Sequence, residues 1–183
     1  MNPFIDVYED DWFYYDVMFA YSRGLMLGTY TDPMLFSPLM NMTRGMIVTI
    51  LFRIDGSPGA LGMLNPFIDV AGDAWYADPV RWAYANGIIE GYSAELFGPD
   101  DHITREQLAA IFHRYASHSG LALPAGRDYA DFGDEAIIET YAKEAVKRLY
   151  MAEVINGKPG NLFDPKGLAA RSEAAAMLRR LLQ

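Results

Sequence analysis

Three arginines recur at the same place in three similar stretches of this 183-residue chain. Arg44, Arg105 and Arg171 each stand at the expected first position of a helix, where the positive end of the helix dipole favours an acidic side chain over a cation. The N–H groups at a helix start bind anions, and a guanidinium beside them can grip a carboxylate through two hydrogen bonds. One interpretation is an anion site at each arginine. The other is an ion pair with an acidic residue of a neighbouring stretch.

The arginines belong to a threefold internal repeat. Trp12 and Trp75 are 63 positions apart, and the arginines follow one another after 61 and then 66 positions. Each repeat reads as a helix, an ordered loop and a second helix, and two helices cannot enclose a core, so the units must pack on one another. We expect units at residues 1–55, 64–118 and 127–183, separated by linkers rich in glycine and proline.

The first helix of each unit is expected over residues 14–22, from Asp78-Pro79 to Asn86-Gly87, and over residues 139–150. Aspartate before proline is typical of a helix start, and Asn-Gly is typical of a helix end.

The second helices are expected to open with the three arginines. Thr43 and Thr104 precede Arg44 and Arg105 as N-caps, and Gln107 can complete a capping box with Thr104. Alanine stands at the cap position of the third unit, which predicts the least well-defined start there, since this exchange costs about 0.5 to 2 kcal/mol.

Composition excludes several classes of function. The net charge of −9 argues against nucleic-acid binding, which depends on clustered Lys and Arg. Cysteine is absent, so no thiolate can act as nucleophile or metal ligand, and we expect no cofactor and no metal site. No apolar run reaches the roughly 18 residues of a membrane span, and an exported chain is expected to have lost its targeting signal.

The middle unit carries a set of ordered motifs. FIDV, WY, AYANGIIEGY and FGPDDHITREQ follow one another in residues 67–107. This pattern resembles the surface-layer homology (SLH) domain, whose signature includes F-x-D-V, G-I-I-x-G and I-T-R-A-E, and the resemblance covers essentially the whole chain as three such domains. It implies an all-α fold in which three helix-loop-helix repeats form a single-chain pseudo-threefold trimer, with the first helices as lobes and the second helices near a central axis.

The resemblance also implies a function. SLH domains anchor exported proteins non-covalently to secondary cell-wall polysaccharide of Gram-positive and related bacteria, often through pyruvylated N-acetylmannosamine. It therefore implies a carbohydrate-binding, non-enzymatic module on the bacterial cell surface, outside the membrane and part of a larger surface protein. Its pockets lie in grooves between units, where the I-T-R-A-E arginine contacts the ligand.

The expected ligand-binding residues are the three arginines and the residues that recur around them. Aspartates at the start of each unit are also candidates to bond nearby backbone, and the glycines to satisfy the backbone. The tryptophans Trp12, Trp75 and Trp82 could stack on sugar rings, but large aromatics at helical spacing usually fill the core. The middle motif is the most complete, so the Arg105 groove ranks first and the Arg171 groove last. The set comprises Arg44, Arg105, Arg171, Thr43, Thr104, Gly28, Gly91, Gly157, Asp6, Asp69 and Asp131.

Two other classes of function compete with this interpretation. An enzyme needs one converging set of acid, base or nucleophile, whereas the acidic residues here repeat by position. A helical protein–protein interaction module with structural arginines is the second alternative, although a tetratricopeptide repeat has a period of about 34 residues.

Overall fold

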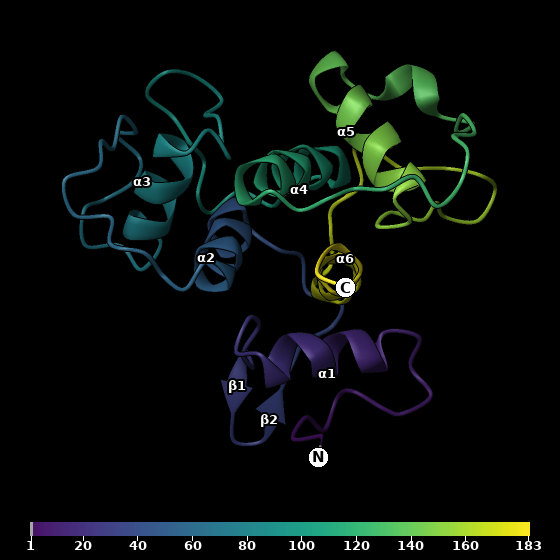
Figure 1. Ribbon diagram of the computed structural model, residues 1–183. Helices are drawn as coiled ribbons and strands as arrows, with labels where there is room; N and C mark the ends of the chain where they lie inside the picture. Colours follow the sequence, from purple (N-terminus) through teal and green to yellow (C-terminus); the bar gives the residue numbers. More distant parts are fainter. Residues whose placement is uncertain (1) are drawn as a thin grey trace.

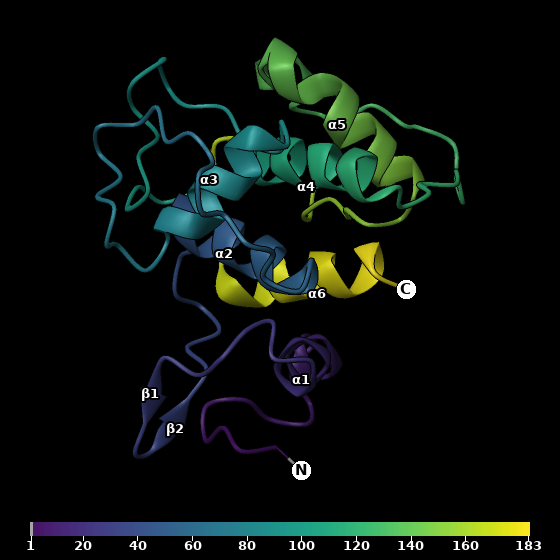
Figure 2. The ribbon, with the colours of Figure 1, turned by 60° about the vertical axis from the view of Figure 1, so that its left-hand side comes forward.

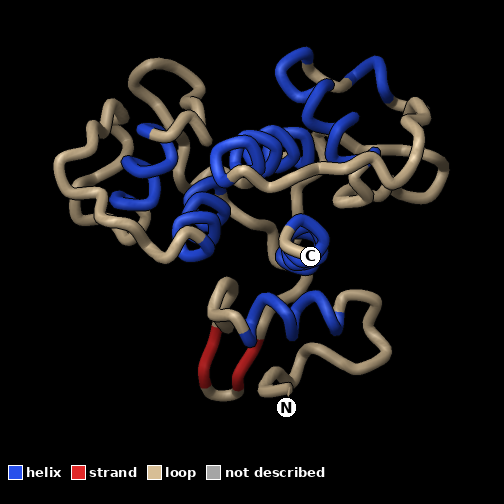
Figure 3. Tube along the Cα trace, in the orientation of Figure 1, coloured by secondary structure: helices blue, strands red, loops and turns tan. Residues whose placement is uncertain are grey.

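The computed structural model describes residues 2–183, so the first residue of the expected first unit lies outside the described part. The regular secondary structure is mostly helical, with one short two-stranded sheet and one 3-10 turn, and long loops join the elements (Figures 1 and 3). No helix in the described range is long and apolar enough to cross a membrane. The elements are α1 (Tyr14–Ser22), β1 (Tyr30–Thr31), β2 (Met34–Leu35), α2 (Arg44–Ile54), α3 (Ala77–Ala85), α4 (Arg105–Ser119), η1 (Glu135–Ile137), α5 (Thr140–Met151) and α6 (Arg171–Leu181).

Most helix ends lie where the sequence places them. The second helices α2, α4 and α6 begin at the three arginines, and α1 has its expected bounds. The start of α3 differs: it begins at Ala77, and Asp78 in its first turn pairs with Arg81 at 2.9 Å instead of capping. The helix α6 begins at the equivalent residue despite its alanine cap, because Glu173 accepts a hydrogen bond from the Ala170 N–H at 3.0 Å.

The helices pair between units rather than within them. The pairs are α2 with α3, α4 with α5, and α6 with α1. Each second helix therefore packs on the first helix of the next unit. The second helix of the third unit packs on the first helix of the first unit, which closes the cycle. Figures 1 and 2 show α2, α4 and α6 in the middle of the molecule, with α1, α3 and α5 outside them. A helix-loop-helix unit is therefore a repeat in sequence but does not form a separate packing unit in space.

The hydrophobic core is formed where helices of different units pack against one another. Val17, Val80 and Val146 lie at equivalent places on the first helices and are completely buried. The second helices bury their own apolar faces in the same cluster, which extends through all three units. Because each first helix covers a second helix from another unit, separating the units would expose this apolar surface to water.

Backbone hydrogen bonds close the same cycle near the starts of the second helices. Ile103 N–H donates to the Met42 carbonyl at 2.9 Å, Ala169 N–H to Ile103 at 3.0 Å, and Met42 N–H to Ala169 at 2.9 Å. Each of these residues lies two positions before the arginine of its unit. The three arginines are therefore fixed by a ring of bonds that includes all three units.

Gly91 illustrates how tightly the loops are packed. A Cβ atom there would lie 2.4 Å from the carbonyl oxygens of Ser93 and Leu96 and 2.5 Å from the Phe67 ring. Glycine is required here for space, since two of the three obstacles are backbone atoms that cannot rotate away.

We predict that Gly91→Ala destabilises the protein by about 1 to 3 kcal/mol, the range for overpacking a tight site. Gly59→Ala is the matched control, because nothing lies within 4 Å of the added Cβ. Urea unfolding followed by circular dichroism would measure both variants, and equal midpoints would contradict this account of Gly91.

Candidate functional site

The three arginines are buried and each reaches into the next unit. The Nε atom of Arg44 donates to the Phe97 carbonyl, that of Arg105 to Phe163, and that of Arg171 to Phe36, each at 2.8 Å. The arginines are only 5 to 7% exposed. Each guanidinium also packs over the phenylalanine ring of the same residue, with its carbon 4.5 to 5.3 Å from the ring centre. The arginines therefore join the units, chiefly through carbonyl groups rather than through the expected acidic partners.

The backbone N–H of each of these phenylalanines donates to an aspartate carboxylate. Asp6 accepts from the N–H groups of Phe36 and Ser37, at 2.8 and 2.7 Å. Asp69 accepts from those of Phe97 and Gly98, at 3.0 and 2.7 Å. These two aspartates bind backbone N–H groups. This agrees with the expectation that they bond nearby backbone, the alternative to ligand binding.

The third unit corrects the sequence expectation. The carboxylate that binds the Phe163 and Asp164 N–H groups, at 2.8 and 2.7 Å, belongs to Asp134 and not to Asp131. The signal was available in the sequence, because each of these aspartates follows a phenylalanine by two positions, and Asp134 follows Phe132. Asp131 offers its main-chain carbonyl to the Asn161 side chain.

The first two N–H groups of each second helix already have acceptors within the protein, contrary to the sequence expectation of donors free for an anion. The Arg44 and Gly45 N–H groups donate to the carbonyls of Asp101 and Pro99, at 3.0 and 2.8 Å, and the Met46 N–H donates to Thr43 Oγ1 at 3.2 Å. In α4 and α6 the first two N–H groups likewise donate to loop carbonyls of the next unit. The third N–H of α4 donates to Thr104 Oγ1, whereas Ala170 offers no side-chain oxygen to α6. An anion near an arginine must therefore meet side chains rather than the helix N-terminus.

A groove adjoins each arginine, and we name it by that residue. The Arg44, Arg105 and Arg171 grooves have volumes of about 150, 360 and 440 Å³. Each is lined by the arginine of one unit, by the loop and second helix of the next unit, and by an aromatic side chain of the remaining unit. The loop glycines in these linings are Gly91, Gly157 and Gly28, in the same order.

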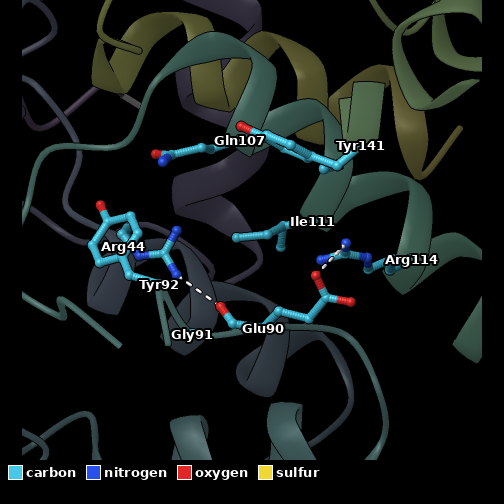
Figure 4. Close-up of a pocket in the computed structure, with 9 residues that line it drawn as sticks. Arg44, Glu90, Gly91, Tyr92, Gln107, Ile111, Arg114 and Tyr141 are labelled. Atoms are coloured by element: carbon cyan, nitrogen blue, oxygen red, sulfur yellow. Dashed lines mark hydrogen bonds and ion pairs between the residues drawn. The ribbon is translucent and has the colours of Figure 1, made fainter. Parts of the chain in front are cut away.

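Figure 4 shows the Arg44 groove. Nη2 of Arg44 donates to the Glu90 carbonyl at 2.9 Å, while the Glu90 carboxylate pairs with Arg114 at 2.9 Å. Gln107 and Tyr141 border the groove from the opposite side. The main chain and side chain of Glu90 thus connect two arginines.

Part of the Arg44 and Arg171 guanidinium groups remains open to a ligand. Within residues 2–183, no protein group accepts a hydrogen bond from their Nη1 atoms. Every fully buried side-chain nitrogen in this range has a partner, so these two atoms are not fully buried. Both Nη1 atoms therefore face solvent. Burial lowers the pKa of Arg44 and lowers that of Arg171 to about 10, with Asp6 opposing the shift of Arg171. A bound anion would favour the charged forms and raise both pKa values.

A second arginine lines every groove, and the sequence interpretation missed it. It belongs to the second helix of the next unit and lies nine positions after the arginine that starts that helix. The fixed offset was the signal that could have identified it. These residues are Arg53 in the Arg171 groove, Arg114 in the Arg44 groove and Arg180 in the Arg105 groove.

The tryptophans divide into two roles. Trp82 is buried in the core, as expected, but Trp12 and Trp75 are 64 and 58% exposed and line the Arg105 and Arg171 grooves. Assigning these two to the core was wrong, because they precede their helices rather than lying on the packed face.

Thr43 and Thr104 cap their helices. Within residues 2–183, the linings of the three grooves do not include either of these threonines, nor Asp6, Asp69 or Asp131.

Comparison with known proteins agrees with the repeat structure. The family model of the S-layer homology domain matches three tandem segments, at residues 3–45, 66–109 and 131–175. Each matched segment extends from the start of a unit into its second helix and includes the groove-lining arginine at the helix start.

Relatives resemble between 64 and 98% of this chain. An endoglucanase of a Bacillus species is 29% identical over 180 residues, 98% of this chain and 19% of the relative. The exoglucanase XynX of Acetivibrio thermocellus is 38% identical over 64% of this chain and 11% of the relative. The surface-layer 125 kDa protein of Lysinibacillus sphaericus is 30% identical over 81% of this chain and 12% of the relative. The chain thus spans less than a fifth of the length of these relatives.

We predict that Asp134→Ala destabilises the protein by about 1 to 3 kcal/mol, because the Phe163 and Asp164 N–H groups lose their acceptor. Asp131→Ala should stay within about 0.5 kcal/mol of the parent, as expected for a surface change. Thermal unfolding of the two variants measures the difference, and a larger loss for Asp131→Ala would refute the assignment.

Proposed function

The chain belongs to the S-layer homology domain family, a family of cell-surface anchoring domains, and from this premise we propose that it binds secondary cell-wall polysaccharide through its inter-unit grooves. The ligand is a pyruvylated glycan that contains N-acetylmannosamine. The module is extracellular, tethers a larger protein to the bacterial wall without a covalent bond, and performs no catalysis itself.

One observation carries this proposal: each groove combines two arginines with an exposed aromatic ring. A pyruvate ketal places one carboxylate on an otherwise neutral sugar, so a binding site needs cations for the carboxylate and a flat apolar wall for the ring. Trp75 supplies the wall of the Arg171 groove, with Arg53 and Arg171 as its cations. A guanidinium and a carboxylate form charge-assisted hydrogen bonds, which are stronger than bonds between neutral groups.

The arginines at the helix starts have two roles in this mechanism. Their Nε atoms join the units, and in the Arg44 and Arg171 grooves their Nη1 atoms offer hydrogen bonds to the ligand carboxylate. The second arginine supplies the other contact. The carboxylate is therefore shared between two side chains. Gly28, Gly91 and Gly157 allow the facing loops to pack tightly, because an added Cβ would lie within 2.9 Å of a neighbouring atom at each of them.

We also infer that the cyclic contacts between units amount to a pseudo-threefold trimer within one chain. Helix pairing, the ring of backbone bonds and the arginine bonds all run in the same cyclic order. Each groove takes side chains from all three units, so the grooves exist only in the assembled trimer. Several grooves in one rigid body would raise residence on a polymer well beyond the affinity of a single site.

A protein–protein interaction module with structural arginines is the alternative, and the inter-unit arginine bonds are compatible with it. Removal of the pyruvate separates the two functions. We predict that wall polysaccharide stripped of pyruvate binds this chain about tenfold or more weakly, since a hydrogen bond to a charged group contributes about 1.5 to 3 kcal/mol. Calorimetry with matched native and stripped polysaccharide measures the change. Equal affinities would exclude the carboxylate mechanism.

The second arginine allows a test that leaves the inter-unit bonds intact. We predict that Arg53→Ala weakens binding of the pyruvylated polysaccharide in the Arg171 groove by about 1.5 kcal/mol or more. The melting temperature should fall only slightly, because Arg53 is exposed and loses one hydrogen bond, to the Leu25 carbonyl at 3.2 Å. Arg148→Ala removes another exposed arginine outside the grooves and serves as the control. If both variants bind alike, Arg53 does not contact the ligand.

A further inference from the structure

The three grooves differ most at one position of the second helix. The residue two places after the helix-start arginine is Met46 in the Arg171 groove, Gln107 in the Arg44 groove and Glu173 in the Arg105 groove. Each lines its groove beside the arginine of the preceding unit, as Gln107 does beside Arg44 in Figure 4. The same place is therefore apolar, neutral polar and anionic in the three grooves.

Glu173 already occupies Nη1 of Arg105, the atom that has no acceptor in Arg44 and Arg171 among the described residues. Its Oε1 accepts from Nη1 of Arg105 at 2.7 Å, and the two side chains are 22 and 8% exposed. Its Oε2 accepts from the Ala170 N–H at 3.0 Å, which fixes the carboxylate against the helix start. Lys158 lies 4.0 Å from the same Oε1 and pairs with Asp164 at 2.6 Å. Arg105 and Lys158 thus have carboxylate partners within the protein, whereas Arg180, the second arginine of this groove, donates only to the Val154 carbonyl, at 3.5 Å, among the described residues.

The Arg171 groove has the opposite character. Arg53 and Arg171 both line it, and within the described residues no acidic side chain does. Glu90 lines the Arg44 groove, but its carboxylate pairs with Arg114 and not with Arg44. A second carboxylate brought next to Glu173 would meet a like charge at close range, which is unfavourable in a partly buried site.

We propose that Glu173 is a built-in carboxylate that keeps anionic ligands out of the Arg105 groove, so that the residue at this helix position determines which grooves bind. The proposal rests on the function proposed above. It makes the Arg171 groove the principal site and reverses the order expected from motif completeness.

Two tryptophans report on two grooves separately. Trp75 lines the Arg171 groove and Trp12 the Arg105 groove, whereas Trp82 is buried and common to all variants. The probe is the methyl glycoside of pyruvylated N-acetylmannosamine. We expect its addition to change the fluorescence of the Trp12→Phe protein, which retains Trp75, and to leave that of the Trp75→Phe protein unchanged at the same concentrations.

Replacing Glu173 should open the closed groove. In the Trp75→Phe, Glu173→Gln double variant, we expect Trp12 to respond with an affinity raised by about tenfold or more, the scale of a regained hydrogen bond to a charged group. Glutamine at this position should preserve the helix start, as Gln107 does by accepting from the Thr104 N–H. Equal melting temperatures of parent and variant serve as the folding control.

The reverse exchange tests the same idea without removing an existing ion pair. Met46→Glu should weaken the Trp75 response by about tenfold or more. It should not lower stability, because glutamate there can complete the capping box with Thr43.

Failure of this inference can be told from failure of the proposed function. If Trp12 responds as strongly with Glu173 present as with glutamine, or if Met46→Glu binds like the parent, the role of Glu173 is refuted while polysaccharide binding stands. If neither tryptophan responds and calorimetry detects no binding of the probe to any variant, the proposed function itself is refuted.

Discussion

One phenylalanine in each unit is hydrogen-bonded through both its backbone N–H and its backbone carbonyl, and the assembly of the units depends on it. The N–H of Phe36, Phe97 or Phe163 donates to a carboxylate of its own unit, and the carbonyl of the same residue accepts from an arginine of the preceding unit. The phenylalanine ring is buried beneath that arginine. One residue thus combines loop geometry, core packing and attachment between units, and losing either polar partner would leave a buried group unsatisfied.

This arrangement explains why a cation stands at the unfavourable end of a helix. The side chain leaves its own helix and crosses to the neighbouring loop, where a carbonyl and an aromatic face offset the cost of the dipole, about 0.3 to 1 kcal/mol. The helix start needs no anion, because carbonyls of the next unit receive its first N–H groups. The grooves therefore obtain their positive character from arginine side chains, and differences between grooves arise from single neighbours such as Glu173.

Much of this could be read from the sequence, because repetition and capping are local signals. The three units, the six helices and the arginines at the second helix starts all follow from spacing and from residues next to one another in the chain. The errors have local causes too. Asp131 is the wrong aspartate, because the F-x-D spacing indicates Asp134, and a capping role for Asp78 is wrong, because α3 begins before it. The nine-residue offset to Arg53, Arg114 and Arg180 was present in the sequence as well.

By itself, the sequence determined which residues recur, where the helices begin and that two helices per unit cannot stand alone. Only the tertiary structure decided that helices pair between units, that the arginines donate to phenylalanine carbonyls, and that each groove takes side chains from all three units. The physical reason is that these contacts join residues 46 to 144 positions apart. Such contacts depend on how apolar faces pack against one another, and no spacing within one repeat can specify that.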